Sequence, residues 1–178
     1  MISVKENLDR LTPRLRRYAR ALTQAAPVPS ETADELVHAS LLRAMVAAAA
    51  ERQGDVALLA FAILTDIHRD SLCEHRSRAA SAGQAGGMRQ PPRRTGPHSA
   101  EDEFVEALAC LTLDEREALF LVAVEQFSYA QAMQILHLSR ASLIARLIRA
   151  RARLSEVLAM RGGKPGRARP APYLRVVK

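Results

Sequence analysis

The stretch "SYAQAMQILHLSRASLIARLIRARARL", residues 128–154, decides the fold of the second half of the chain. Ser128 and Gln131 stand at capping-box spacing, so a helix is predicted to begin after Ser128. A short turn around His137 follows, and Ser139 is a candidate N-cap for another helix. Two helices joined by a short turn, the second of them basic, are typical of a helix-turn-helix unit.

The second of these helices carries two kinds of face. Apolar residues at helical spacing predict the face that packs on the domain core: Leu143, Leu147, Ala150 and Leu154. A row of arginines on another face is suited to contact DNA phosphates and base edges: Arg146, Arg149 and Arg153, with Arg140 one turn earlier. Ile144 and Ile148 add a second apolar ridge. A DNA-binding face, a protein-binding face and a solvated basic helix therefore remain three open interpretations.

The composition extends the helical prediction to the whole chain. The 178 residues are 48% hydrophobic but only 4% aromatic, with no Trp, so the core must consist of Leu, Ala, Val and Ile. Abundant Ala and Leu favour an all-α fold, and the length suits one medium domain or two small ones. Cys73 and Cys110 form no CxxC pair, so neither a zinc site nor a disulfide framework is implied.

Basic charge is segregated along the chain. The formal net charge is +7, yet residues 75–98 hold five arginines and no acid, and residues 161–178 hold six bases and no acid. The Gly-, Pro-, Ser- and Arg-rich stretch 77–99 predicts a flexible basic linker. We therefore expect two small helical domains, 1–76 and 100–160, joined by this linker and followed by a basic tail, 161–178. Such charge blocks suit a polyanionic partner, although solubilising charge is the simpler interpretation.

Three helices are predicted in the first domain from their apolar stripes. These stripes are Leu11, Leu15, Tyr18 and Leu22 in the first helix, Ala33, Leu36, Val37, Ser40, Leu41 and Ala44 in the second, and Leu59, Ile63 and Ile67 in the third. The first covers residues 11–22, the second follows Ser30 as its N-cap, and the third spans about 55–78. In the second domain, Thr112 and Glu115 have capping-box spacing at the start of a further helix.

Several of these stretches resemble the extracytoplasmic-function (ECF) sigma factors, small bacterial initiation factors built from two helical domains. The stretch "REALFLVAVEQFSY", residues 116–129, is most similar to the branch that serves the alphaproteobacterial general stress response. In the first domain, "RLRRYARAL" (14–22) and "ADELVHASLLRA" (33–44) resemble the helices that bind core RNA polymerase. The resemblance covers about three quarters of the chain and implies two helical domains, as the composition does.

The resemblance implies a cytoplasmic sigma factor that directs RNA polymerase core to stress-responsive promoters under the control of an anti-sigma factor. It assigns promoter DNA contacts to Arg140, Ser142, Arg146, Arg149, Arg153, Asp66, Arg69, Arg76 and Arg78. It assigns polymerase contacts to Glu35, Leu36, Val37, His38, Leu41 and Leu42.

An alternative follows from positions where the chain departs from the family pattern. Leu59 and Asp66 stand where the family has the Trp and Asn that help to melt the promoter, and Ala39 replaces a carboxylate. Ile144 replaces a Lys, and His137 replaces a turn Gly, which predicts a reshaped turn. Leu59, Asp66, Ala39 and Ile144 motivate the alternative of a sigma mimic that sequesters an anti-sigma factor or regulator without initiating transcription. A DNA-binding regulator that uses only the second domain is a third possibility.

Other function classes find little in the sequence. The motifs GxxxxGK[ST], GxSxG and HExxH do not occur, so no enzymatic activity, metal or cofactor is expected. The apolar run "VALLAFAIL", residues 56–64, is too short to span a bilayer, so no membrane insertion is expected.

Overall fold

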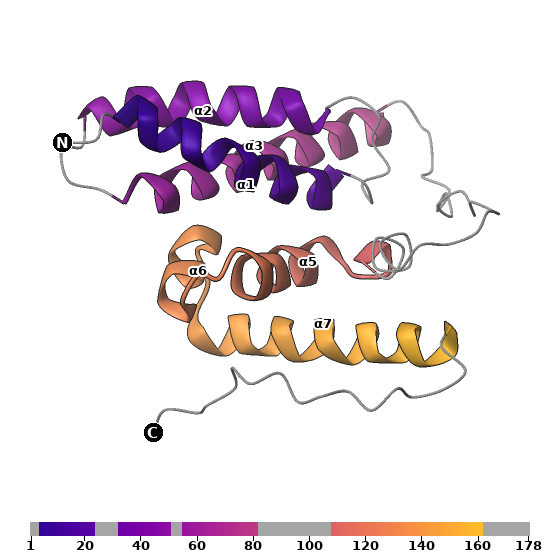
Figure 1. Ribbon diagram of the computed structural model, residues 1–178. Coiled ribbons are helices and arrows are strands. Elements are labelled where there is room, and N and C mark those ends of the chain that lie inside the picture. Colours follow the sequence, from indigo (N-terminus) through magenta and orange to yellow (C-terminus); the bar gives the residue numbers. More distant parts are fainter. Residues whose placement is uncertain (1–3, 24–31, 51–54, 82–107, 162–178) are drawn as a thin grey trace.

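The computed structural model describes residues 4–23, 32–50, 55–81 and 108–161, and all regular structure in these ranges is helical (Figure 1). This confirms the predicted all-α fold. The elements are α1 (Val4–Thr23), α2 (Ala33–Ala50), α3 (Val56–Ser81), α5 (Leu113–Leu119), the π-helical turn η1 (Phe120–Val124), α6 (Tyr129–Leu136) and α7 (Arg140–Arg161). No helix within these ranges is long and apolar enough to cross a membrane.

Both predicted capping boxes of the second half are confirmed. The Thr112 side chain accepts a hydrogen bond from the Glu115 backbone N–H, and the Glu115 side chain accepts one from the Thr112 backbone N–H. Ser128 and Gln131 make the same reciprocal pair at the start of α6. Ser139 Oγ accepts a hydrogen bond from the Ser142 backbone N–H at 3.2 Å, as predicted for the start of α7. Local sequence therefore fixes where these three helices begin.

The start of α2 differs from the prediction. Ser30 lies outside the described residues, and the helix begins at Ala33. Thr32 Oγ1 accepts a hydrogen bond from the Glu35 backbone N–H at 3.3 Å, and the Glu35 carboxylate accepts one from the Thr32 N–H at 2.9 Å. This Thr32–Glu35 capping box satisfies two backbone donors, which explains why the helix begins there.

The third helix is longer than predicted and enters the stretch assigned to the linker. α3 continues to Ser81, whose hydroxyl donates to the Ser77 carbonyl at 2.9 Å. An Arg78–Glu74 ion pair at 2.9 Å, one turn apart, supports the same segment. The rest of the predicted linker, the first residues of the predicted second domain and most of the basic tail lie outside the described residues.

The helices form two units that pack directly on each other (Figure 1). We call α1–α3 the first unit and Leu108–Arg161 the second unit. In Figure 1, α5 and α6 lie next to the first unit and α7 lies on the far side of the second. The apolar stripes predicted from helical spacing are buried or partly buried, among them Leu15, Tyr18 and Leu22 in α1, Leu36, Val37 and Ala44 in α2, and Leu143, Leu147 and Ala150 in α7.

Aromatic rings join the two units into one core. The Tyr18 ring lies 5.4 Å from that of Phe61 within the first unit and 6.4 Å from that of Phe120 in the second. Phe61 also meets Phe127 edge-on at 5.0 Å. Such contacts add about 1 kcal/mol each to the gain from burying apolar area. Four of the five aromatic residues in the described ranges therefore lie where the units meet.

Candidate functional site

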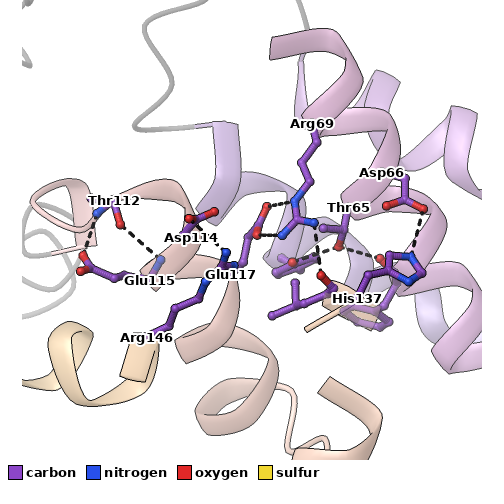
Figure 2. A network of polar contacts seen from close by, with 12 residues as sticks. Thr65, Asp66, Arg69, Thr112, Asp114, Glu115, Glu117, His137 and Arg146 are labelled. Atoms are coloured by element: carbon purple, nitrogen blue, oxygen red, sulfur yellow. Dashed lines mark hydrogen bonds and ion pairs between the residues drawn. The ribbon is translucent and has the colours of Figure 1, made fainter. Parts of the chain in front are cut away.

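The arginine row of α7 lies against the start of α5. Arg146 approaches Asp114 at 3.2 Å, and its side chain is only 17% exposed. Arg149 and Arg153 both approach Glu115, at 3.5 and 2.8 Å. Figure 2 shows the Arg146 side chain reaching toward Asp114. Three of the arginines predicted to contact DNA are therefore paired with carboxylates inside the second unit.

Glu115 has a structural role in addition to these ion pairs. Its carboxylate completes the capping box with Thr112 at 3.1 Å and also accepts a hydrogen bond from Arg153. The residue is 2% exposed. Acids are favoured in the first turn of a helix because they interact with its dipole, and α5 has two of them there. The same acids then attract the guanidinium groups of α7.

An ion pair connects the first unit to the second. Arg69 of α3 donates from Nε to Glu117 Oε1 of α5 at 3.1 Å, and its Nη2 donates to Oε2 of the same carboxylate (Figure 2). Its remaining nitrogen, Nη1, donates to the Leu136 carbonyl of α6 at 3.4 Å. The Glu117 side chain has no exposed area. Burial raises the pKa of the Glu117 carboxyl, and the hydrogen bonds from Arg69 oppose that rise.

Beside this pair, Asp66 faces His137 across the same boundary. Asp66 Oδ2 lies 3.8 Å from His137 Nε2, and both side chains are exposed (Figure 2). His137 has φ 53° and ψ 47°, the left-handed conformation that a Gly normally supplies. The expected reshaping of the turn is therefore wrong. The turn keeps its left-handed form because the His137 and Leu138 N–H groups still bond back to α6 carbonyls, at 3.4 and 3.0 Å.

A further ion-pair contact between the two units forms at Glu125, and it was not predicted from the sequence. The Glu125 carboxylate, directly after η1, forms ion pairs with Arg14 and Arg17, each at 2.8 Å. The Glu125 side chain has no exposed area. Arg14 also donates to the Glu125 carbonyl at 2.7 Å and stacks over Phe61 and Phe127, 5.5 Å from each ring centroid. The one sequence signal was a lone carboxylate in the apolar run "LVAVEQF". A charge at such a position requires a partner when the run is buried.

His68 and Arg116 lie buried at the same boundary. Arg116 donates to the carbonyls of Leu108, Leu111 and, across the boundary, Leu22, at 3.1, 2.8 and 3.4 Å. His68 is 3% exposed, and neither ring nitrogen has a hydrogen-bond partner among the described residues. Burial, reinforced by the charges of Arg116 and Arg69, lowers the pKa of His68 to about 4. His68 is therefore neutral near pH 7.

The residues assigned to polymerase binding divide between core and surface. Leu36 and Val37 are buried core residues, Leu41 is partly buried, and Glu35 and His38 are exposed. Leu42 is 53% exposed, and helical spacing places it beside Met45 (46%) and Val46 (74%). We call Leu42, Met45 and Val46 the α2 patch. Met45 and Val46 were not predicted, because the family motif used for the assignment ends before them.

The remaining predicted DNA contacts lie at the surface. Arg76 and Arg140 are exposed, and Arg78 pairs with Glu74. The Ser142 hydroxyl lies 2.9 Å from that of Ser139. On the outer side of α7, Ile144 is partly buried and Ile148 is 62% exposed. Among the described residues, no group of His, Cys, Asp or Glu side chains could hold a metal ion.

Comparison with known proteins connects this architecture to a family. Residues 108–153 match the family described as "Response regulator PhyR, sigma-like domain". Over 165 residues, the chain is 31% identical to the ECF RNA polymerase sigma factor EcfG of Rhodopseudomonas palustris (strain TIE-1). That alignment covers 91% of this chain and 88% of EcfG.

Two solved structures are similar in fold. The sigma factor RpoE of Bartonella quintana, in complex with the anti-sigma factor NepR, matches with a TM-score of 0.69 and 26% identity, over 86% of this chain and 95% of that one. The PhyRSL–NepR complex from Sphingomonas sp. Fr1 matches with a TM-score of 0.58 and 26% identity, over 89% and 92% of the two chains. Because the identity to EcfG extends over most of both proteins, the chain belongs to the ECF RNA polymerase sigma factor family.

Proposed function

We propose that this chain is a cytoplasmic, stress-responsive sigma factor that binds core RNA polymerase through the α2 patch and is controlled by an anti-sigma factor. The observation that carries the proposal is the patch itself. Leu42, Met45 and Val46 expose apolar area side by side on α2, the helix that resembles the polymerase-binding helix of the family. Contiguous exposed apolar surface is a feature of many protein-binding sites, which supports a protein partner at this face of α2.

Control by an anti-sigma factor is supported by the relatives. The RpoE and PhyRSL structures were both solved in complex with NepR, and both cover most of this chain at 26% identity. We extend that partner class, an anti-sigma protein of the NepR kind, to this chain. The exposed apolar residues on α2 and α7 offer surface for such a partner in addition to polymerase.

A sigma mimic is the second candidate, and a specific observation favours it. Arg69, Arg146, Arg149 and Arg153, all predicted DNA contacts, are paired with carboxylates of α5. Asp66 adds a carboxylate on α3 where the family has an amide. Such a surface attracts DNA phosphates less than the sequence suggests.

Polymerase recovery separates the two candidates. The full-length chain is incubated with purified core RNA polymerase and, separately, with a purified NepR protein, and each mixture is analysed by size exclusion. A sigma factor is expected to bind both and to yield promoter-specific transcripts with core polymerase. Binding to NepR alone, with no polymerase complex, would support the mimic and overturn the sigma proposal.

The α2 patch is tested with a matched pair of variants. Val46→Glu places a charge in the patch and is expected to weaken polymerase binding at least about 10-fold, since a desolvated charge has no partner there. Ile148→Glu makes the same change at an exposed isoleucine of α7 and serves as the control. Equal weakening by both variants would show that the α2 patch has no special role.

A further inference from the structure

We propose that buried arginine–glutamate pairs hold the two units closed, and that this closed form withholds Arg69 from DNA because Glu117 occupies the place of a phosphate. The inference rests on the proposed function only in taking DNA as the competing polyanion. Contact between the two units is a property of the fold and can be measured without DNA.

Arg69 uses three donor atoms in its contacts with the second unit. Its Nε and Nη2 atoms both donate to Glu117, and Nη1 donates to the Leu136 carbonyl. All three guanidinium nitrogens are therefore engaged by the second unit. A phosphate binds in the same Nε/Nη2 fork that holds a carboxylate, so it can occupy this fork only in place of Glu117.

The edge of α3 that carries Arg69 lies beside the second unit. Asp66, one turn earlier on α3, faces His137 in the turn between α6 and α7 (Figure 2). The edge of α3 that the family resemblance assigns to promoter DNA is thus the edge that meets α5 and α6. In the closed form the second unit covers part of this edge and leaves the Arg69 side chain 30% exposed.

Within the described residues, the Arg69–Glu117 pair is one of two buried ion-pair contacts between the units, which we call junctions. Glu125 of the second unit holds Arg14 and Arg17 of the first by the same chemistry, on a different helix. Both carboxylates, Glu117 and Glu125, have side chains without exposed area, and each is bound by guanidinium groups of the opposite unit. Both pairs form only while the units are in contact, and removing either carboxylate leaves its guanidinium partners without their counter-charge in the closed form alone.

These contacts predict a linkage between opening and DNA binding. When only a fraction of the molecules is open, the apparent affinity for a ligand of the open form falls by that fraction. Neutralising Glu117 and Glu125 should therefore both raise the open population and strengthen DNA binding. The double variant Glu117→Gln/Glu125→Gln makes this change while it preserves side-chain shape and one hydrogen-bond acceptor at each position.

The matched control removes two exposed carboxylates of the first unit that are not paired with a predicted DNA contact. Asp34 pairs with Arg16 at 3.0 Å, and Asp9 lies on the exposed side of α1. Asp9→Asn/Asp34→Asn changes the net charge by the same amount as the junction variant. Any effect of overall charge on DNA binding is therefore equal in the two proteins.

The open population is measured by the distance between two spin labels in the full-length chain. One label is placed at Cys73 on α3 and the other at Ser155→Cys on α7, in a Cys110→Ser background. The junction variant is expected to show a longer or broader distance distribution than the control, and at least about 10-fold tighter binding to a duplex of unrelated sequence. The affinity should also fall more steeply with salt, because additional phosphates are contacted.

A closed-locked protein tests the same inference without weakening the fold. Asp66→Cys and His137→Cys are introduced after Cys73→Ser and Cys110→Ser, and a short bifunctional thiol reagent bridges the two new cysteines. The bridged protein is expected to bind the duplex at least about 10-fold more weakly than the same protein capped with a monofunctional reagent.

Each outcome decides part of the inference. An unchanged label distance in a folded junction variant would overturn closure by these pairs. A longer distance with DNA affinity equal to that of the control, or equal DNA binding by bridged and capped proteins, would overturn the competition with DNA. Absence of a polymerase complex would defeat the proposed function but leave the distance measurement intact, so the two failures are distinguishable.

Discussion

Arg69 and Glu117 are 48 residues apart in sequence, yet the guanidinium of one holds both carboxylate oxygens of the other. The pair joins a helix of the first unit to a helix of the second, and the carboxylate is fully buried. Its burial makes it different from the surface ion pairs of the chain, and the stability of the fold should depend on it.

We expect Glu117→Ala to lower the free energy of unfolding by about 3 kcal/mol, because it leaves Arg69 without its carboxylate partner in a largely buried site. Asp34→Ala removes an equally charged residue from an exposed pair and should cost less than about 1 kcal/mol. Urea denaturation followed by circular dichroism measures both values. Similar losses for the two variants would mean that the buried pair contributes no more than a surface pair.

The free energy of unfolding should depend on pH through the protonation of His68. Its pKa is about 4 in the folded protein, against an ordinary value of about 6.5 in the unfolded chain. Because the folded value is the lower one, the unfolded state takes up the proton first. The contribution of neutral His68 is therefore complete above about pH 6.5 and is lost as the pH falls toward 4, by about 3 kcal/mol in total.

The variant His68→Leu isolates this contribution, since it removes the titrating group and keeps an apolar side chain of similar size. The stability difference between the two proteins is expected to shift in favour of the variant as the pH falls from 6.5 to 4. A difference that stays constant over this range would show that His68 keeps an ordinary pKa in the folded chain.

The turn between α6 and α7 offers a stabilising substitution. His137 has a φ of 53°, a conformation in which a Cβ atom costs about 1 kcal/mol. His137→Gly removes that cost and should raise the midpoint of thermal unfolding by a few degrees. Gln126→Gly, at a φ of 60°, is the comparison in a turn where no contact equivalent to that with Asp66 is lost. If His137→Gly destabilises the fold and Gln126→Gly does not, the contact between His137 and Asp66 contributes measurable stability.

On α7, exposure identifies which isoleucine to change. Ile148 is 62% exposed and Ile144 only partly so, so Ile148→Lys should leave stability within about 0.5 kcal/mol. The added cation is expected to strengthen duplex binding and to increase the slope of log affinity against log salt by about 1. Fluorescence anisotropy over a salt series provides the measurement. An unchanged slope would mean that DNA does not meet this side of α7.

Much of the fold follows from short-range sequence signals. Helical spacing identified the buried stripes of α1, α2 and α7, and capping-box spacing located the starts of α5 and α6, because these patterns depend on residues three or four apart. The start of α2 was misplaced because the prediction assigned the N-cap to Ser30 without considering Thr32, two residues later. Thr32 is the one with a Glu three residues later.

The candidate site was less predictable, for a physical reason. Periodicity shows that Arg146, Arg149 and Arg153 share a face of α7, but it does not show that the acids of α5 cover it. The partners of Arg14, Arg17 and Arg69 lie in another unit, and only the tertiary fold brings them together. Family resemblance locates the arginines but does not report which of them are already neutralised.

The aromatic contacts between the units have a practical consequence for dissecting the chain. Tyr18 and Phe61 meet Phe120 and Phe127 across the boundary, so a fragment that contains one unit alone would present these rings to water. Such truncations are expected to aggregate when expressed singly and to become soluble when the complementary fragment is supplied in the same cell. If co-expression restores solubility, the two units would serve as the halves of a split reporter that reassembles through a shared aromatic core.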